Sequence, residues 1–544
     1  MASQPVGHRR DLLANEFMSE TFGSAIYPGS SGRRPGVTAA SLLVLSVVVG
    51  VVLFASLRSP LKDDIAWLLY VARRWLAGRE LYIDVVEVNP PLIVWISAVP
   101  IQIANWLGVD QQLVAIPFFV SAVMSCAWWT SVLLTPRHGV FSDPIPVFAA
   151  ISTVLLLVPA GDLGQREHLL VAAALPYLAL FAGSLDGKQP AAWAAVSAGL
   201  LAGLGCALKP RYALVFLALE CLAFARGLRP WRLMPLSAAT SLVAYGGLVA
   251  LLCPAYLRRA VPLALALYGA TDVSFVHLLA DSVVLIMVEG LALLLWWMLQ
   301  QRMPERSLML VLVLCAAVST TVCFMDGKDW FYHRLPATIA VLLALILCVA
   351  SVWSRGRHHG WGSMVPSVLA AVAGLILSIS AIQRLEPEVA MAVEPDRSTV
   401  ARLEKLIRQE HAHTYIAFSE WIALGFPVVN NTGVAWASRF DSMWALKGEL
   451  WRARFDPAAS REWPIRRWVV HDFIAGCPDL AVVDRRGGLN YVEVLTASDP
   501  AFARAWSRYK PVDAFDGLVI YRRSAAGCVD PWVAAGELGT GQTP

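Results

Sequence analysis

Charged residues are scarce in this chain. Asp, Glu, Lys and Arg make up only 15% of its 544 residues, whereas soluble domains average roughly 25%. Hydrophobic residues account for 57% of the sequence. This balance is untypical of a soluble protein and indicates a chain that is embedded in a membrane.

A continuous basic stripe is also missing. The formal net charge is only +4, and the Lys and Arg residues lie in short clusters between apolar runs. Proteins that bind nucleic acid need positive charge gathered along one face or one helix. We therefore expect no nucleic-acid partner.

The sequence has no cysteines at metal-ligand spacing, no internal repeat and no low-complexity linker. Seven of its nine cysteines fall inside apolar segments, where a thiol behaves as a small hydrophobe; they are Cys126, Cys206, Cys221, Cys253, Cys315, Cys323 and Cys348. Cys477 and Cys528 lie in the C-terminal region. A disulfide between them is an open alternative if that region is periplasmic.

Long apolar runs are abundant instead. Runs of about 17–25 apolar residues fit the hydrocarbon core of a bilayer as helices. About eleven segments have this character: 37–57, 112–134, 145–160, 168–184, 191–207, 211–225, 233–253, 276–299, 307–325, 335–353 and 362–383. No small-residue cleavage site follows the first run, so we expect it to be a retained span.

A further apolar segment, 92–107, is interrupted by Pro100, Gln102 and Asn105 and follows Pro90-Pro91. If it does not cross the membrane and the N-terminus is cytoplasmic, the basic loops fall on the cytoplasmic side. Those loops contain Arg226, Arg229, Arg232, Arg302, Arg306, Arg355 and Arg357. This is the positive-inside pattern. We therefore predict that 92–107 is a helix lying at the outer interface.

The chain changes character near residue 385, where charges become frequent. Strand-like stretches at 414–418, 478–483 and 518–522 and a helix start at Ser498-Asp499-Pro500 indicate an α/β domain. The prediction is a cytoplasmic tail at 1–36, a membrane domain at 37–384 with an outer loop at 58–111, and a soluble periplasmic α/β domain at 385–544. Within that domain, segment 438–444 mixes aromatic and charged residues, as sugar-contacting loops and ordinary surfaces both do.

The first outer loop begins with an acidic pair, Asp63-Asp64. One helical face of the residues that follow is apolar, made of Ile65, Leu68, Leu69, Ala72, Trp75 and Leu76, and Gly78 suits a C-terminal cap. This pattern predicts an amphipathic helix against the membrane surface. The two acids then either cap that helix or meet a lipid head group.

The pair Asp63-Asp64, the turn from Gly78 to Tyr82 and the pair Pro90-Pro91 resemble the C-type glycosyltransferase superfamily (GT-C). The likeness is to the branch of protein O-mannosyltransferases and aminoarabinose transferases of lipid A. It covers the first 110 residues well and the rest as architecture, and Asp64 stands where nearer relatives often have Glu. The resemblance implies a GT-C-like polytopic α-helical membrane protein with about eleven transmembrane helices, a C-terminal periplasmic α/β domain, and Asp63 as general base.

The chemistry of glycosyl transfer explains why an acid is needed. An acceptor hydroxyl has a pKa far above 7, so a carboxylate must take its proton as the sugar C1–O bond breaks. With Asp63 as the base, Asp64 would orient the acceptor or hold a metal with Asp84 or Glu87; the sequence leaves open which of the two acids is the base. Those three oxygen ligands are too loosely spaced to establish a site, and a divalent metal is left open.

Polar residues also gather at the outer ends of other predicted spans. They are Asp162, Gln165, Arg166, Glu167 and His168 after one span, Lys209 and Arg211 after another, and Lys328, His333 and Arg334 after a third. Such residues are costly at a membrane boundary unless they line a wet cavity or pair with one another. A donor phosphate needs cations, so Arg166, Lys209, Lys328, His333 and Arg334 are candidates to hold it. Asp162 or Glu167 would contact the sugar, although interfacial cations and aromatics also serve as plain anchors.

These features predict a multi-pass glycosyltransferase of a bacterial inner membrane. It would move a sugar from a polyprenyl-phosphate donor to an envelope lipid, polysaccharide or protein at the periplasmic face. A flippase for lipid-linked saccharides is the first alternative, but it should show broken or polar helices near the midplane. Here the charged residues concentrate at the outer ends of the predicted spans, and Glu220 and Glu289 are exceptions near the edges of spans. A non-catalytic membrane scaffold is the other alternative.

Overall fold

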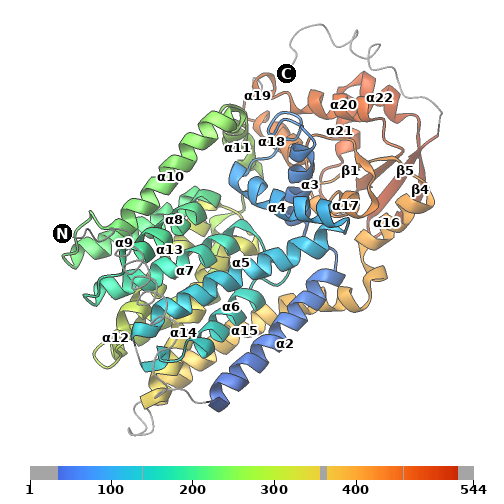
Figure 1. Ribbon diagram of the computed structural model, residues 1–544. Helices are drawn as coiled ribbons and strands as arrows, with labels where there is room; N and C mark the ends of the chain where they lie inside the picture. The colour runs from blue at the N-terminus through green and yellow to red at the C-terminus, as the bar shows by residue number, and fades with distance from the viewer. Residues whose placement is uncertain (1–34, 138, 356–363, 457–458, 525–544) are drawn as a thin grey trace, which may run out of the picture.

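A bundle of long helices forms one part of the protein, and a smaller mixed domain forms the other (Figure 1). The computed structural model describes residues 35–137, 139–355, 364–456 and 459–524. The bundle helices are α2 (Pro35–Arg58), α5 (Gln111–Leu134), α6 (Pro144–Leu157), α7 (Arg166–Leu185), α8 (Ala192–Leu208), α9 (Ala213–Ala225), α10 (Leu233–Leu252), α12 (Phe275–Leu299), α13 (Arg306–Asp326), α14 (Leu335–Arg355) and α15 (Met364–Val393). Each predicted span therefore contains a helix.

The bundle helices differ in length. Eight helices of the described residues are long and apolar enough to cross a membrane. Helices α6, α8 and α9 have 14, 17 and 13 residues, and 13 or 14 residues reach only about 20 Å along a helix axis. The helical membrane architecture is confirmed, and the count of eleven spans stays a prediction.

Apolar side chains on the outside of the bundle have no protein neighbour to cover them. Leu43 on α2 is 67% exposed, and Val243 and Leu251 on α10 are 75% and 80% exposed. Helices α7 and α14 instead lie inside the bundle and are mostly buried. Large exposed apolar surfaces mark contact with a partner or a membrane, so these outer faces are the lipid-facing surface.

Close packing of α8 against α10 depends on two glycines one turn apart. A Cβ atom at Gly199 or Gly203 would overlap the side chains of Ser237 or Ser241 and the backbone of α10. Ser241 also donates a hydrogen bond to the carbonyl oxygen of Leu200 at 3.2 Å. Small residues at this spacing let membrane helices approach closely.

Two helices lie between the bundle and the mixed domain (Figure 1): α3 (Asp63–Leu76) and α4 (Pro91–Leu107). Helix α4 is the predicted interfacial helix, and it lies at the same end of the bundle as α3. Lys62 occupies the N-cap position of α3 and makes no side-chain capping bond. The acids Asp63 and Asp64 therefore sit inside the first turn, where negative charge favours the helix N-terminus.

The mixed domain is built on a five-stranded sheet of order β2-β1-β3-β5-β4. Its strands are β1 (Thr414–Phe418), β2 (Ala435–Trp436), β3 (Leu480–Asp484), β4 (Tyr509–Phe515) and β5 (Leu518–Arg523). Strand β1 pairs parallel with β2 and β3, whereas β5 pairs antiparallel with β3 and β4. The helices are α16 (Thr399–Gln409), α17 (Val428–Thr432), α18 (Trp444–Arg452), α19 (Ala459–Glu462), α20 (Ile465–Gly476), α21 (Tyr491–Ser498) and α22 (Pro500–Trp506).

The sequence predicted the main elements of this domain. Strands β1 and β5 lie where expected, β3 begins two residues later than the predicted stretch, and Asp499 caps α22 by accepting a hydrogen bond from the Ala501 N–H at 2.9 Å. Strands β2 and β4 were missed, because β2 has only two residues and β4 contains a proline and a bulge. The pairing of Cys477 with Cys528 stays a prediction, since Cys528 lies outside the described residues.

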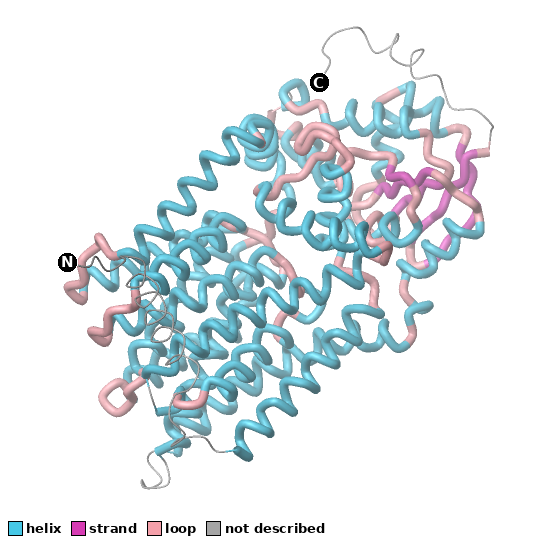
Figure 2. The backbone as a smooth tube through the Cα atoms, in the orientation of Figure 1, coloured by secondary structure: helices cyan, strands magenta, loops and turns pink. Residues whose placement is uncertain are grey.

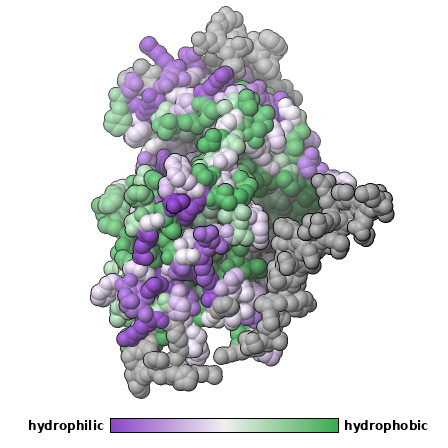
Figure 3. All heavy atoms as spheres, turned by 60° about the vertical axis from the view of Figure 1, so that its left-hand side comes forward, coloured by the Kyte–Doolittle hydropathy of each residue, from purple (hydrophilic) through white to green (hydrophobic). Residues whose placement is uncertain are grey.

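The mixed domain docks on one end of the bundle through α3, the loop between α3 and α4 and the segment before α12. Val86 donates a backbone hydrogen bond to Arg439 at 2.8 Å, and the Asn430 side chain donates to the carbonyl of Ala66 at 2.8 Å. Figure 2 shows the strands of this domain on one side of the molecule, with connecting loops gathered also at the opposite end of the bundle. Figure 3 brings that opposite end forward and shows hydrophilic residues gathered over it.

Candidate functional site

A cavity of about 610 Å³ lies where the bundle meets the mixed domain. From the bundle side it is lined by the first turn of α3, loop 86–89, the first residue of α7 and the aromatic residues Tyr268, Trp330 and Tyr332. From the mixed domain it is lined by residues 420–423 and by Asp441, Ser442, Trp444 and Lys447. The bundle and the mixed domain therefore share one site. Its walls are largely aromatic and carry a few polar groups, a composition that is usual for small-molecule pockets.

The predicted acidic pair faces this cavity. The backbone N–H of Asp64 donates to Oδ1 of Asp63 at 2.9 Å, and the Lys62 ammonium lies 3.7 Å from the same oxygen. Gln165 donates from Nε2 to Oδ2 of Asp64 at 3.1 Å. Burial raises the pKa of Asp63, and the charge of Asp64 raises it further, against the opposing charge of Lys62. Asp63 is therefore a stronger base than a solvated aspartate.

Arg166 is the first residue of α7 and lines the same cavity, although it is only 4% exposed. Its Nε lies 3.9 Å from Oε2 of Glu167, too far for a hydrogen bond. In the described part of the chain its side chain makes no hydrogen bond, and its guanidinium lies over the ring of Tyr332 at 5.8 Å from the centroid. Buried donors without acceptors favour an anionic ligand, since guanidinium binds phosphate through paired hydrogen bonds.

A layer of ion pairs lies behind Arg166. Glu167 is fully buried and lies 2.9 Å from the Lys209 ammonium and 3.6 Å from Nε2 of His333. Asp326 pairs with Arg211 and lies 3.2 Å from Nδ1 of His333. These residues converge as the sequence led us to expect, but their cations face carboxylates and none of them lines the cavity. Their contribution to a phosphate site is therefore indirect.

Other predicted cations also have partners. Lys328 is buried, pairs with Asp272 and donates to the carbonyl oxygen of Tyr268 at 2.6 Å. Arg334 pairs with Asp329. His168 is fully buried, accepts a hydrogen bond from the Gly164 N–H at 3.1 Å and lies within hydrogen-bond distance of the Leu155 carbonyl. These contacts position the loops around the cavity.

The remaining predicted acids occupy three different environments. Glu87 lines the cavity, accepts hydrogen bonds from the indole of Trp67 and from the Val88 and Asn89 N–H groups, and so fixes loop 86–89 to α3. Asp84 accepts a hydrogen bond from the Glu80 N–H at 3.0 Å in an exposed turn away from the cavity. Asp162 is buried close to the acidic pair.

The neighbours of Asp162 oppose one another. Burial raises the pKa of Asp162 to about 7, against Lys62, which lowers it, while Asp64 and Asp63 raise it. The carboxyl group is therefore poised to gain or lose a proton near neutral pH, directly behind the acidic pair.

The eight cavity residues of the mixed domain were not predicted as site residues: Glu420, Trp421, Ile422, Ala423, Asp441, Ser442, Trp444 and Lys447. Lys447 pairs with Glu420 at 2.6 Å, and the Trp444 ring lies 5.1 Å from that of Tyr268 across the junction. Burial raises the pKa of Asp441 to about 8, with further contributions from Glu87 and Asp64. The mixed aromatic and charged composition of 438–444 was the available signal, but only the docking of the two parts shows which of these residues reach the cavity.

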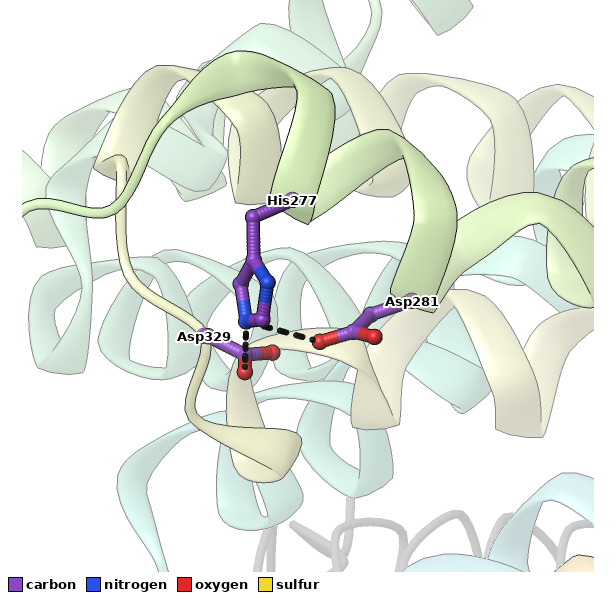
Figure 4. Close-up of side chains that lie close together, drawn as sticks. All are labelled: His277, Asp281 and Asp329. Atoms are coloured by element: carbon purple, nitrogen blue, oxygen red, sulfur yellow. Dashed lines mark hydrogen bonds and ion pairs between the residues drawn. The ribbon is translucent and has the colours of Figure 1, made fainter.

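Candidate metal ligands meet elsewhere. Among the described residues, His277, Asp281 and Asp329 are the group whose ligand atoms lie within 4.8 Å of one another (Figure 4). His277 Nε2 lies 3.3 Å from Asp281 and 3.0 Å from Asp329, and Arg334 pairs with Asp329. This half-exposed network ties α12 to the loop after α13. Asp64, Asp84 and Glu87, the ligands that the sequence left open, form no such group in the described part of the chain.

No family model and no curated protein sequence matches the chain. Solved structures do match it. They include ArnT from Cupriavidus metallidurans bound to undecaprenyl phosphate, with 13% identity, a TM-score of 0.54, and coverage of 90% of this chain and 99% of that chain. The apo structure of the same protein matches with 14% identity, a TM-score of 0.52, and coverage of 90% and 98%. This likeness confirms the GT-C-like fold predicted from the sequence.

Proposed function

We propose that this protein is a membrane glycosyltransferase that moves a sugar from a polyprenyl-phosphate carrier to an acceptor of the cell envelope. The observation that carries the proposal is the shared cavity, in which the acids Asp63 and Asp64 line the same space as Arg166, whose side chain makes no hydrogen bond within the described residues. A base for the acceptor and a cation for the leaving phosphate are the two groups that this reaction needs. The fold of ArnT, a protein crystallised with undecaprenyl phosphate, supports a polyprenyl-linked donor.

In the proposed reaction, the phosphate of the donor binds Arg166, and the ion pairs of Glu167 with Lys209 and His333 hold that end of α7 in place. Asp63 accepts the proton of the acceptor hydroxyl while its oxygen attacks C1 of the sugar. The C1–O bond to the phosphate breaks at the same time, and the bond electrons leave with the phosphate, whose charge Arg166 stabilises. Attack from the face opposite the phosphate inverts the anomeric centre.

The mixed domain supplies the wall of the cavity opposite the bundle. Trp421 and Trp444 offer flat apolar surfaces, and Asp441 and Ser442 offer hydrogen bonds. Such a wall suits a sugar ring or a hydroxyl-bearing acceptor. We assign acceptor binding to this side, because the bundle side already holds the acids and the phosphate cation.

We place this cavity on the periplasmic side of a bacterial inner membrane. The loops rich in arginine line a different cavity at the other end of the bundle, which includes Arg137, Arg226, Arg302 and Arg306. Basic loops stay preferentially in the cytoplasm. The opposite end, with the mixed domain, then faces the periplasm, where an envelope acceptor is within reach.

A deletion strain tests this proposal. Mass spectrometry of envelope glycans and of polyprenyl-phosphate-linked sugars should show that one sugar decoration disappears while its lipid-linked donor accumulates. Complementation with the wild-type gene should reverse both changes. A strain in which the glycans are unchanged, or in which the donor accumulates on the cytoplasmic side only, would contradict the proposal; the second outcome would favour a flippase.

A further inference from the structure

The end of the bundle remote from the mixed domain contains a second polar cavity, of about 680 Å³. Its wall is formed by η1 (Thr135–Arg137), the end of α7, the end of α9 and the α12–α13 connection. Five cations line it, namely Arg137, Lys188, Arg226, Arg302 and Arg306, against two carboxylates, Asp186 and Glu305. The cavity therefore has an excess of positive charge.

The carboxylates of this cavity already have partners. Asp186 pairs with Arg137 and also accepts the hydroxyl hydrogen of Ser307. Glu305 accepts a hydrogen bond from the Ser351 hydroxyl at 2.9 Å. Even with both acids ionised, five cations face two carboxylates, so the cavity keeps an excess of positive charge.

Several of the cations, by contrast, have unused donors. The side chains of Arg226 and Arg306 make no hydrogen bond or ion pair within the described part of the chain. The Arg137 side chain is only 7% exposed, and its buried Nη1 has no hydrogen-bond partner among the described residues. A buried donor in this condition is costly unless a ligand satisfies it. The arrangement is complementary to an anion with several oxygen atoms.

An apolar cavity of about 170 Å³ is lined by residues of some of the same elements as the polar cavity. Apart from Thr130 its lining is entirely apolar. Three stretches of chain contribute to both cavities. The residues that line the apolar cavity are Leu134, Ala179 and Leu308, and those that line the polar cavity on the same stretches are Arg137, Asp186 and Ser307. The cationic cavity and the apolar cavity therefore follow one another along the helices, in the same order as the charged head group and the acyl chain of a lipid.

We propose that this pair of cavities binds an anionic phospholipid, with its phosphate against Arg137, Arg226 and Arg306 and an acyl chain in the apolar cavity. Basic pockets between transmembrane helices are known to take anionic lipid head groups. Residues 1–34 are a poor alternative occupant, because they contain four arginines against three acidic residues. A free phosphate would leave the apolar cavity unfilled.

Native mass spectrometry of the purified full chain in detergent tests the proposal. Phosphatidylglycerol should bind, and phosphatidylcholine with the same acyl chains should bind at least roughly tenfold more weakly. The double variant Arg226→Ala/Arg306→Ala should lower phosphatidylglycerol affinity by about tenfold or more. These two side chains are exposed and unpartnered, so their removal should leave folding intact. The matched control is Arg467→Ala/Arg485→Ala, which removes two exposed arginines of the mixed domain and should bind as the wild type does.

Two further experiments distinguish binding of a phospholipid from binding of a free anion and from occupation of the site by residues 1–34. Ala150→Leu narrows the apolar cavity and should weaken phosphatidylglycerol without changing binding of glycerol 3-phosphate. Equal phosphatidylglycerol affinity in the arginine double variant and its control would overturn the proposal. So would tight binding of glycerol 3-phosphate combined with no effect of Ala150→Leu, which indicates an anion site only. Phosphatidylglycerol binding that appears only after residues 1–34 are deleted would instead identify that segment as the occupant.

Discussion

The amide of Gln165 donates a hydrogen bond to Oδ2 of Asp64 at 3.1 Å and so joins two segments that are 101 residues apart. Gln165 is fully buried, and its own Oε1 has no hydrogen-bond partner within the described residues. One oxygen of Asp64 is therefore occupied, and the orientation of its carboxylate is set from the start of α7. We infer that Asp64 positions the acceptor, whereas Asp63 is the base.

Replacing Gln165 should therefore lower activity without unfolding the protein. A hydrogen bond to a charged group contributes about 1.5–3 kcal/mol, so Gln165→Leu should lower kcat/KM by about 10- to 100-fold. Gln112→Leu is the matched control, because Gln112 also ties two segments together, through the Ser56 carbonyl at 2.7 Å, but makes no hydrogen bond to the acidic pair. Equal rates for both variants in a transfer assay would argue against the positioning role.

Removing the charge of Arg166 should weaken recognition of the donor phosphate. Arg166→Gln should lower kcat/KM for the lipid-linked donor by about 100-fold, as expected when a buried charge-assisted contact to a phosphate is lost. Arg211→Gln serves as the control, since Arg211 is half-exposed and pairs with Asp326 outside the cavity wall. The assay follows transfer at varied donor concentration. If kcat/KM falls as much in the Arg211 variant as in the Arg166 variant, the donor phosphate binds among the ion pairs of Glu167 and Asp326 instead.

Asp441 should make stability depend on pH. Burial raises its pKa to about 8, so the folded state holds a proton that the unfolded chain releases near its ordinary pKa of about 4. The stabilisation of the folded state by this bound proton is complete below the unfolded pKa of about 4 and is lost as the pH rises toward the folded pKa of about 8. Asp441→Asn removes this titration, and the melting temperature of the variant relative to the wild type should therefore increase from pH 5 to pH 9. Asp513→Asn, at an exposed position of β4, should show no such trend.

The parts of the site that are local in sequence were predictable. The acidic pair after the first apolar run, the polar residues at the start of α7 and the helix α4 all follow from hydropathy and spacing. Asp441 and Trp444 were not assigned, because their place in the cavity depends on the docking of two parts of the chain. Lys209 and His333 look like phosphate ligands in sequence, but buried carboxylates elsewhere in the chain pair with them, and sequence does not reveal such pairing.

The close contact of α8 with α10 should be sensitive to a single methyl group. A Cβ at Gly203 would overlap the Ala238 carbonyl and the Ser241 hydroxyl, whereas a Cβ at Gly246 on α10 would meet nothing within 4 Å. Gly203→Ala should therefore destabilise the protein by about 1–3 kcal/mol through overpacking. Gly246→Ala should leave the thermal unfolding in detergent unchanged. Similar melting temperatures for the two variants would show that α8 and α10 are not packed this closely.

The most direct test of the account is glycosyl transfer by purified protein carrying Asp63→Asn, using the lipid-linked donor that accumulates in the deletion strain. The account predicts a rate lower by about 10²- to 10⁴-fold, as when a general base is lost, with donor binding retained. Asp84→Asn, in an exposed turn outside the cavity, should transfer at the wild-type rate. A wild-type rate for Asp63→Asn would contradict the assignment of Asp63 as the base.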